Sequence, residues 1–169
     1  MCDSLRSELE AYLETLNIRT RCVEHPPVFT VEEMTPHLQD VSGAVTKNLF
    51  LKDKKKKGLW LVSVRHDRQV NLSDLAKKLG VGSSNLRFAD EAAMLDKLKV
   101  GRGCATALAL MFDKELSVRL VLDQDLVVGG HERVYFHPMT NAASVGLRPD
   151  DLLRFLKETG HEPVLESFE

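Results

Sequence analysis

The sequence predicts a single α/β domain of the α+β type, in which a mixed, largely antiparallel sheet is covered by helices. Two observations predict this class. Short alternating runs typical of strands are separated by helical segments, and some runs follow each other closely enough to form hairpins. The chain of 169 residues has the size of one domain and contains no linker-like stretch or internal repeat. We therefore expect one domain over residues 1–169.

Capping residues mark the predicted helices. Ser4 is placed to cap the first helix. Thr30 and Glu33 form a capping box, and Asp90 precedes a further helix. Pro149 stands in the first turn of the final helix, where proline is favoured. The expected helices are Ser4–Leu16, Val31–Leu38, Asn71–Gly80, Asp90–Leu98 and Pro149–Gly160.

Alternating apolar runs predict the strands. His25-Pro26-Pro27 ends the first run, because a residue before proline is pushed away from helical geometry towards an extended one. The run Lys54–Lys57 indicates a solvated hairpin tip, with an RNA-binding patch as the alternative. The expected strands are Ile18–Glu24, Ala44–Lys52, Gly58–Arg65, Leu86–Phe88, Ser117–Leu122, Arg133–His137, Ala143–Gly146 and Pro163–Glu166.

Composition describes an ordinary globular protein, with 43% hydrophobic and 28% charged residues. The net charge of -2 gives no global attraction to nucleic acid, so RNA binding would need a local basic patch. The three cysteines are widely spaced and odd in number, which favours a reducing compartment. The sequence has no apolar run of membrane-spanning length, and charged residues stand near the N-terminus. We expect a cytoplasmic protein without membrane contact.

One lysine on a predicted central strand stands out. Side chains alternate between the faces of a strand, so Lys47 shares its face with the apolar residues Val45 and Leu49. Such a lysine is costly unless it meets an anion or a solvent-filled pocket. The alternative is a lysine whose ammonium group reaches water along its apolar stem. Asn48 would face away from Lys47 on a regular strand. A bulge, or a role in holding the loop behind the site, would let both residues act.

Four segments resemble a known family when taken together. They are His25-Pro26-Pro27-Val28-Phe29-Thr30, Thr46-Lys47-Asn48-Leu49-Phe50-Leu51-Lys52, the loop 101–110, and Phe136-His137-Pro138-Met139-Thr140-Asn141. In this order they resemble the YbaK/ProX-type aminoacyl-tRNA deacylases, most closely the free-standing prolyl-tRNA synthetase-associated domains. The resemblance covers almost the whole chain. It implies the fold of that family and hydrolysis of the ester between alanine and the terminal adenosine of proline tRNA, without a cofactor. The acceptor end of tRNA(Pro) is then the expected partner, and a prolyl-tRNA synthetase is a further candidate.

The resemblance also assigns roles to residues. In such enzymes the motif lysine is catalytically important and holds the phosphate or sugar end of the tRNA, and the matching residue here is Lys47. Asn48 matches the motif asparagine, and His137 matches the histidine of the F-H-P segment. The family loop G-x-x-x-P corresponds to Gly103–Ala107, where Ala107 replaces the proline. Proline restricts φ and alanine does not, so this departure puts the rigidity of the loop in question.

Hydrolysis of an activated ester needs a positioned water and stabilisation of the developing oxyanion. Backbone N–H groups of the glycine-containing loop are candidates for that stabilisation, with a simple turn as the alternative. A second sieve must admit alanine and exclude proline. The apolar candidates for its walls fit an ordinary core equally well. The candidate substrate-binding residues are Gly101, Gly103, Cys104, Ala105, Thr106, Phe29, Val31 and Val45.

The remaining candidates have weaker signals. His137 fits proton transfer and a purely structural role about equally. Lys52 and Arg87 are candidates for tRNA contact, because Lys52 lies near the motif strand and Arg87 lies in a predicted strand-edge segment. Cys104 suggests a nucleophile, but no motif offers it a paired base, so a buried thiol is favoured. The histidines lack ligand-like spacing with the cysteines, so we predict no metal site.

Three functional hypotheses remain open at this stage. The first is a trans-editing deacylase, favoured by the presence of Lys47, Asn48 and His137. The second is a catalytically inert tRNA- or synthetase-binding module of the same fold, favoured by Ala107. The third is a cysteine hydrolase acting through Cys104.

Overall fold

The computed structural model describes residues 2–28, 31–38, 43–53, 58–80, 86–101 and 104–168. Within these ranges, eight strands form one mixed sheet. Its strands are β1 (Arg21–Glu24), β2 (Ala44–Asp53), β3 (Leu59–Arg65), β4 (Leu86–Phe88), β5 (Val118–Asp123), β6 (Val134–Phe136), β7 (Ala143–Leu147) and β8 (Val164–Glu166). The order is β1-β7-β6-β2-β3-β5-β8, and β4 pairs with β2 beside this path. Four of the seven described pairings are antiparallel, which confirms the predicted fold class.

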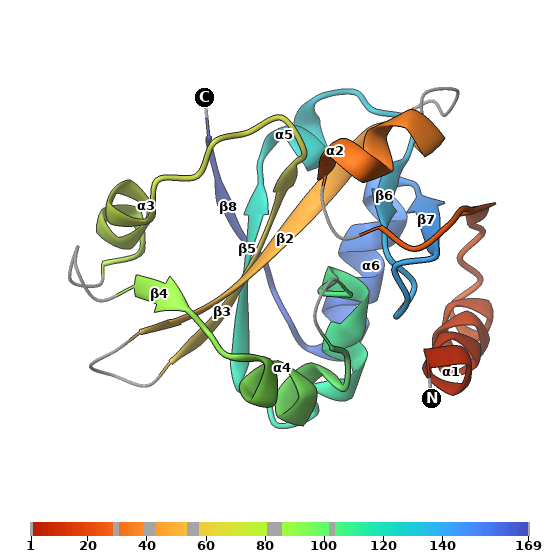
Figure 1. Ribbon diagram of the computed structural model, residues 1–169, viewed down its shortest axis with the longest axis horizontal. Helices are drawn as coiled ribbons and strands as arrows, with labels where there is room; N and C mark the ends of the chain where they lie inside the picture. The colour runs from red at the N-terminus through yellow and green to blue at the C-terminus, as the bar shows by residue number, and fades with distance from the viewer. Residues whose placement is uncertain are drawn as a thin grey trace.

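Helices cover both faces of this sheet (Figure 1). They are α1 (Cys2–Thr15), α2 (Val31–Met34), the 3-10 helix η1 (Thr35–Leu38), α3 (Leu72–Leu79), α4 (Glu91–Leu98), the 3-10 helix η2 (Ala107–Phe112), α5 (Asp125–Val128) and α6 (Pro149–Thr159). The larger core packs α1, α4, η2 and α6 against the face that carries Phe50 and Leu61. A smaller cluster packs α3 against the opposite face, where Leu51 and Trp60 point. In the described part of the chain, no helix combines the length and apolar character needed to span a bilayer.

Helix caps behave largely as the sequence predicts. Asn71 and Asp90 accept the N-terminal hydrogen bonds of α3 and α4, and Gly80 and Gly160 end α3 and α6 in left-handed geometry. The predicted cap at Ser4 is wrong, because no helix-breaking residue precedes Ser4 and α1 continues back to Cys2. The proposed Thr30 cap and the Lys54–Lys57 run lie outside the described residues.

Some elements differ from the prediction. The first strand begins at Arg21, three residues later than expected, because Ile18 still donates its backbone N–H to Leu13 at the end of α1. Arg21 is also the first residue of this strand to pair with β7. The short helix α5 was not predicted, since four residues are too few for a periodic pattern.

Strand β2 positions the candidate site. On one side it pairs with β3 without interruption from Thr46 to Lys52. On the other side, within the described residues, β6 pairs with β2 at Ala44 and Val45, and β4 pairs with it only from Leu51 onwards. Residues 46–49 therefore face a break in the sheet. Lys47, Asn48 and Leu49 are all partly exposed, although side chains on both faces of a central strand are normally buried.

Candidate functional site

The motif strand is regular around Lys47 and Asn48. The one-to-one register with β3 runs through both residues, so the bulge considered from the sequence is absent in this strand. Lys47 lies opposite Val64, and Asn48 lies opposite Ser63. The two side chains therefore point to opposite faces, and the break in the sheet is the feature that they share.

Lys47 lies between two apolar clusters on its face. On one side Val45 packs with Val28 and Met34, and on the other side Leu49 packs against the cluster beneath α3. The Lys47 ammonium donates a hydrogen bond to the backbone carbonyl of Arg68. An ammonium group has three donors. In the described part of the chain no carboxylate forms an ion pair with it, so its positive charge is oriented by a neutral partner.

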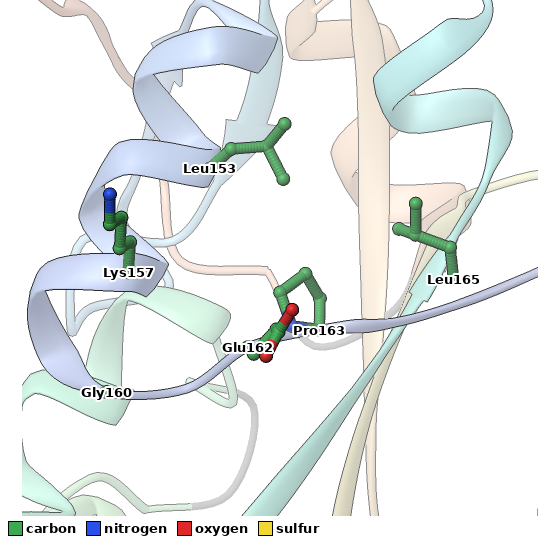
Figure 2. Close-up of a pocket in the computed structure, with 6 residues that line it drawn as sticks. All are labelled: Leu153, Lys157, Gly160, Glu162, Pro163 and Leu165. Atoms are coloured by element: carbon green, nitrogen blue, oxygen red, sulfur yellow. The ribbon is translucent and has the colours of Figure 1, made fainter.

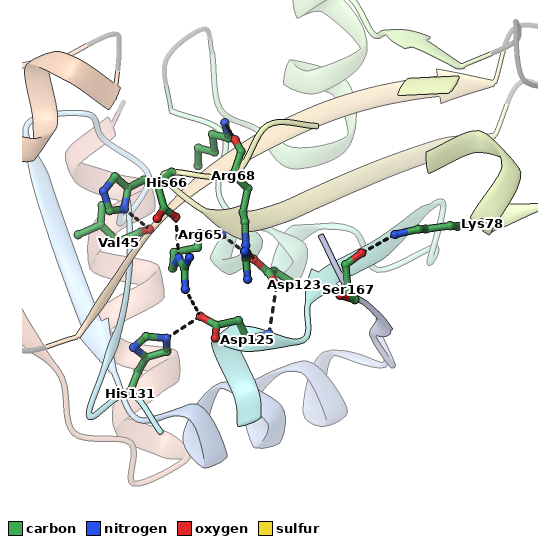
Figure 3. A network of polar contacts seen from close by, with 11 residues as sticks. Val45, Arg65, His66, Arg68, Lys78, Asp123, Asp125, His131 and Ser167 are labelled. Atoms are coloured by element: carbon green, nitrogen blue, oxygen red, sulfur yellow. Dashed lines mark hydrogen bonds and ion pairs between the residues drawn. The ribbon is translucent and has the colours of Figure 1, made fainter. Parts of the chain in front are cut away.

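Arg68 belongs to a tight turn that follows β3, and this turn is anchored by a buried aspartate (Figure 3). The Arg68 backbone N–H donates to the carbonyl of Arg65 over 3.0 Å. One carboxylate oxygen of Asp123 accepts from Arg68 Nε at 3.0 Å and from the Arg65 backbone N–H at 3.1 Å. The other oxygen accepts from the Asp125 backbone N–H at 3.1 Å. This anchor was not predicted from the sequence. Its only signal was an aspartate directly after the apolar run of β5.

Neighbouring charges extend the same network towards the surface. Arg65 forms ion pairs with Asp67 and Asp125, and His131 also contacts Asp125. The hydrogen bond from His131, together with that from Arg65, holds the pKa of Asp125 below its usual value. The hydrogen bond from Arg65 lowers the pKa of Asp67 in the same way. These carboxylates are therefore ionised at neutral pH.

Asn48 ties three strands together on the opposite face. Ser63 of β3 donates its hydroxyl to Asn48 Oδ1, and Asn48 Nδ2 lies 3.5 Å from Thr46 Oγ1. Thr46 in turn donates to the backbone carbonyl of Tyr135 in β6 over 2.6 Å. Asn48 thus belongs to a polar chain that crosses β2 beside the break. This geometry fits a supporting role, and direct participation of Asn48 in catalysis stays a prediction.

His137 directly follows β6, which ends at Phe136. The parallel register pairs Val45 with Tyr135, so a continuation by two residues on each strand would reach Lys47 and His137. His137 Nδ1 lies 3.0 Å from the carbonyl oxygen of Ala143. Because a carbonyl can only accept, Nδ1 carries the proton, and the lone pair of the neutral ring lies on Nε2.

The surroundings of His137 keep it neutral. Burial lowers the pKa of His137 below its usual value, the nearby charge of His25 lowers it further, and the hydrogen bond to Ala143 opposes the shift. The His25 ring lies edge-on to it at 6.5 Å between centroids, and His25 also stacks on His37 at 5.4 Å. His137 is therefore suited to accept a proton near neutral pH.

The described part of the glycine-containing loop forms a capped turn. The Cys104 N–H donates to the Gly101 carbonyl over 3.1 Å, and the Thr106 hydroxyl accepts from Leu108 at the start of η2. Gly101, Cys104, Ala105 and Thr106 all have ordinary negative φ, so the positive φ expected of an anion-binding nest is missing from these four residues. Gly103 lies outside the described residues.

The structure places the other apolar candidates in cores. Val45 is buried with Val28 and Met34, and Cys104 is buried in the larger core at 8% exposure, as expected for a buried thiol. Ala107, the residue that replaces the family proline, is fully buried as the first residue of η2. Phe29 and the side chain of Val31 lie outside the described part of the structure.

Lys52 and Arg87 lie side by side. They are directly paired across β2 and β4, and both are exposed. Like charges in facing positions repel, so this pair favours an anionic partner. Five residues separate Lys52 from Lys47, which places Lys52 roughly 17 Å further along the strand and on its other face.

A hollow beside α6 is not this site (Figure 2). Its volume is about 560 Å³, and it lies between the end of α6 and the segment that leads into β8. The lining residues are Leu153, Lys157, Gly160, Glu162, Pro163 and Leu165. None of them is a predicted site residue, and the hollow offers only one lysine and one glutamate among aliphatic groups. Across the described ranges, no group of three or more histidine, cysteine, aspartate or glutamate side chains is arranged to hold a metal ion.

Comparisons with known proteins identify the family and the fold of this chain. Residues 25–155 match the family model described as the aminoacyl-tRNA editing domain. The chain is 66% identical to the prolyl-tRNA synthetase associated domain-containing protein 1 of Xenopus laevis, over 100% of both chains. It is 34% identical to the prolyl-tRNA editing protein ProX of Acetoanaerobium sticklandii, over 89% of this chain and 90% of the relative. The solved structure of the hypothetical protein APE2540 superposes with a TM-score of 0.71 at 20% identity, covering 92% of this chain and 96% of that chain, which supports the fold.

The neutral state of His137 predicts a pH dependence of stability. In the unfolded chain a histidine binds a proton below about pH 6.5. The folded chain binds it only at lower pH, so unfolding takes up a proton in this window and stability falls as the pH drops below about 6.5. In His137→Gln, whose amide can still donate to Ala143, this loss should become smaller. Urea unfolding between pH 5 and 8 measures it, and an unchanged pH dependence in the variant would contradict the assignment.

Proposed function

Because this chain belongs to the aminoacyl-tRNA editing domain family, we propose that it is a trans-editing hydrolase that deacylates mischarged Ala-tRNA(Pro). The family agrees with the resemblance seen in the sequence. The name of the ProX relative, a prolyl-tRNA editing protein, supports tRNA(Pro) as the substrate. The name of the Xenopus laevis relative supports a prolyl-tRNA synthetase as a partner. A cytoplasmic location, where tRNAs are charged, is part of this proposal.

The environment of Lys47 is the observation that carries this proposal. Lys47 is a partly exposed residue of β2 beside the break, and its ammonium is held by the neutral Arg68 carbonyl rather than by a carboxylate. A carboxylate partner would cancel its charge, whereas a carbonyl orients the group and leaves its charge available to an anion. The proposed reaction brings the phosphate or sugar end of the tRNA to this position, and a phosphate group there is the anion that Lys47 would meet.

His137 has the state needed to activate water. With its proton on Nδ1, the free Nε2 accepts a proton from a water whose oxygen attacks the ester carbonyl carbon. The tetrahedral intermediate then collapses, and His137 returns the proton to the departing ribose oxygen of the terminal adenosine. The products are free alanine and uncharged tRNA. In this scheme Asn48 supports the strand on which Lys47 stands.

The alternative of an inert binding module depended on Ala107. In the structure Ala107 is enclosed at the start of η2, and the Thr106 hydroxyl caps this short helix directly before it. The end of the loop is therefore anchored without proline. This observation favours the enzyme over the inert module.

Substitution of Lys47 tests the proposal. Purified protein should release alanine from Ala-tRNA(Pro) relative to a no-protein control, and Lys47→Ala should lower the rate by about tenfold or more, equivalent to ~1.4 kcal/mol in the barrier. Lys114→Ala, which changes an exposed lysine between η2 and β5, is the matched control and should retain the wild-type rate. Wild-type turnover by a folded Lys47→Ala protein would rule out the assigned role.

Substitution of Cys104 separates the water mechanism from a cysteine hydrolase. Cys104→Ser should keep most of the activity, because water is the proposed nucleophile. Its free energy of unfolding should fall by about 1–3 kcal/mol, since a hydroxyl replaces a thiol in an apolar core. Deacylation assays and urea unfolding measure the two effects. Loss of all activity in a folded variant, together with a trapped acyl-enzyme in the wild type, would instead support catalysis by the thiol.

The paired cations Lys52 and Arg87 predict salt-sensitive binding of tRNA. A few phosphate contacts give a shallow negative slope of log affinity against log salt, because each neutralised phosphate releases counterions. Lys52→Glu should weaken tRNA binding more than Lys55→Glu, because Lys55 has lysine neighbours in the sequence that can compensate. Anisotropy titrations at several salt concentrations compare the variants. If Lys55→Glu abolishes binding while Lys52→Glu matches the wild type, the acceptor stem binds at the lysine run.

A further inference from the structure

Arg68, whose backbone carbonyl accepts from Lys47, forms a buried ion pair with Asp123 through its side chain. The side chain of Asp123 is 1% exposed and that of Arg68 is 11% exposed, so the pair is almost completely removed from solvent. Their burial makes both side chains poor candidates for direct contact with a tRNA. Their position raises the question of what this pair does for the site.

Asp123 joins both ends of the turn that presents the Arg68 carbonyl. A single oxygen of its carboxylate accepts from the Arg65 N–H at the start of the turn and from Arg68 Nε at its end. The turn is further tied to β2, because the His66 N–H donates to the Val45 carbonyl over 2.8 Å. These bonds determine where the Arg68 carbonyl lies relative to the Lys47 ammonium.

Charge balance explains why an ion pair suits this position. The carboxylate of Asp123 is neutralised by Arg68 and so does not compete with the substrate for Lys47. The part of Arg68 that reaches Lys47 is an uncharged carbonyl. Lysine has a flexible stem with many rotamers, so a restraint on its ammonium lowers the entropy cost of meeting the tRNA.

We propose that Asp123 and Arg68 are positioning residues for Lys47, and that this pair sets the orientation of the ammonium through the Arg68 carbonyl. The pair acts on the reaction only through Lys47. This proposal rests on the proposed deacylation where activity is measured. The labelling measurement requires only that Lys47 be present and needs no reaction.

The activity measurement is a double-mutant cycle under single-turnover conditions with Ala-tRNA(Pro). Asp123→Asn should lower the rate by about tenfold or more, because small displacements of a positioned group are costly. In the Lys47→Ala background the same substitution should cost less than about twofold, since residues that act as a unit are non-additive. A wild-type rate in folded Asp123→Asn, or losses that multiply in the double variant, would overturn the proposal.

Asp67→Asn is the matched control. It removes the same charge from the same turn, but Asp67 is exposed and pairs only with Arg65 among the described ion pairs. Exposed ion pairs contribute little, so its rate should stay within about twofold of the wild type. A loss equal to that of Asp123→Asn would show that any charge removed from this turn has the same effect, and would also overturn the proposal.

Chemical labelling tests the positioning without the reaction. Acetylation of the free protein by acetic anhydride, quantified by mass spectrometry, should modify Lys47 more readily in Asp123→Asn than in the wild type, with Lys52 as the internal reference. Unchanged labelling of Lys47 would overturn the proposal. If the wild type fails to deacylate Ala-tRNA(Pro), the proposed function fails, and the labelling still decides the positioning.

Removal of one member of a buried pair leaves the other charge unpaired, which can prevent folding. If Asp123→Asn does not fold, the double variant Arg68→Gln/Asp123→Asn replaces it, because it removes both charges and leaves two amide-bearing side chains. The cycle with Lys47→Ala and the labelling are then repeated on that background, with the same outcomes for and against.

Discussion

The incomplete pairing of β2 is the constraint on which the rest of the site depends. This strand is bonded along its length to β3, but on its other side it meets β6 at one end and β4 at the other. The break between them makes Lys47, Asn48 and Leu49 accessible in the middle of a sheet. A continuous neighbour strand would have closed this opening. In that case β2 could have contributed only to the core.

Lys47 and His137 both form hydrogen bonds with neutral backbone carbonyls, which orient the two side chains without adding an opposite charge. Lys47 is held by the Arg68 carbonyl, and the buried carboxylate of Asp123 is neutralised by the Arg68 side chain. His137 bonds to a carbonyl through Nδ1, and its burial keeps the ring neutral. The proposed site therefore combines one oriented cation with one neutral base. This pairing suits hydrolysis of an ester that is attached to a polyanion.

The two faces of the sheet pack against different apolar clusters. The face of Lys47 carries the smaller apolar clusters, beneath α3 and around Val45, whereas the face of Asn48 carries the larger core. The loop that ends at Thr106 packs into that larger core. Asn48 and the capped loop thus support the strand from behind, and they leave the opposite face to the lysine. A motif of two adjacent residues can in this way contribute both a reactive group and its scaffold.

The sequence by itself determined the class of fold, the caps of α3, α4 and α6, and the alternation of Lys47 and Asn48, because these depend on contacts between near neighbours along the chain. It also contained the family motifs around Lys47 and His137. It could not show the break beside β2, because that depends on where β6 and β4 stop pairing. Nor could it show the anchor at Asp123, since 55 residues separate this aspartate from Arg68. Only the tertiary structure decided these features, because they arise where segments distant in sequence must satisfy each other's charges and hydrogen bonds.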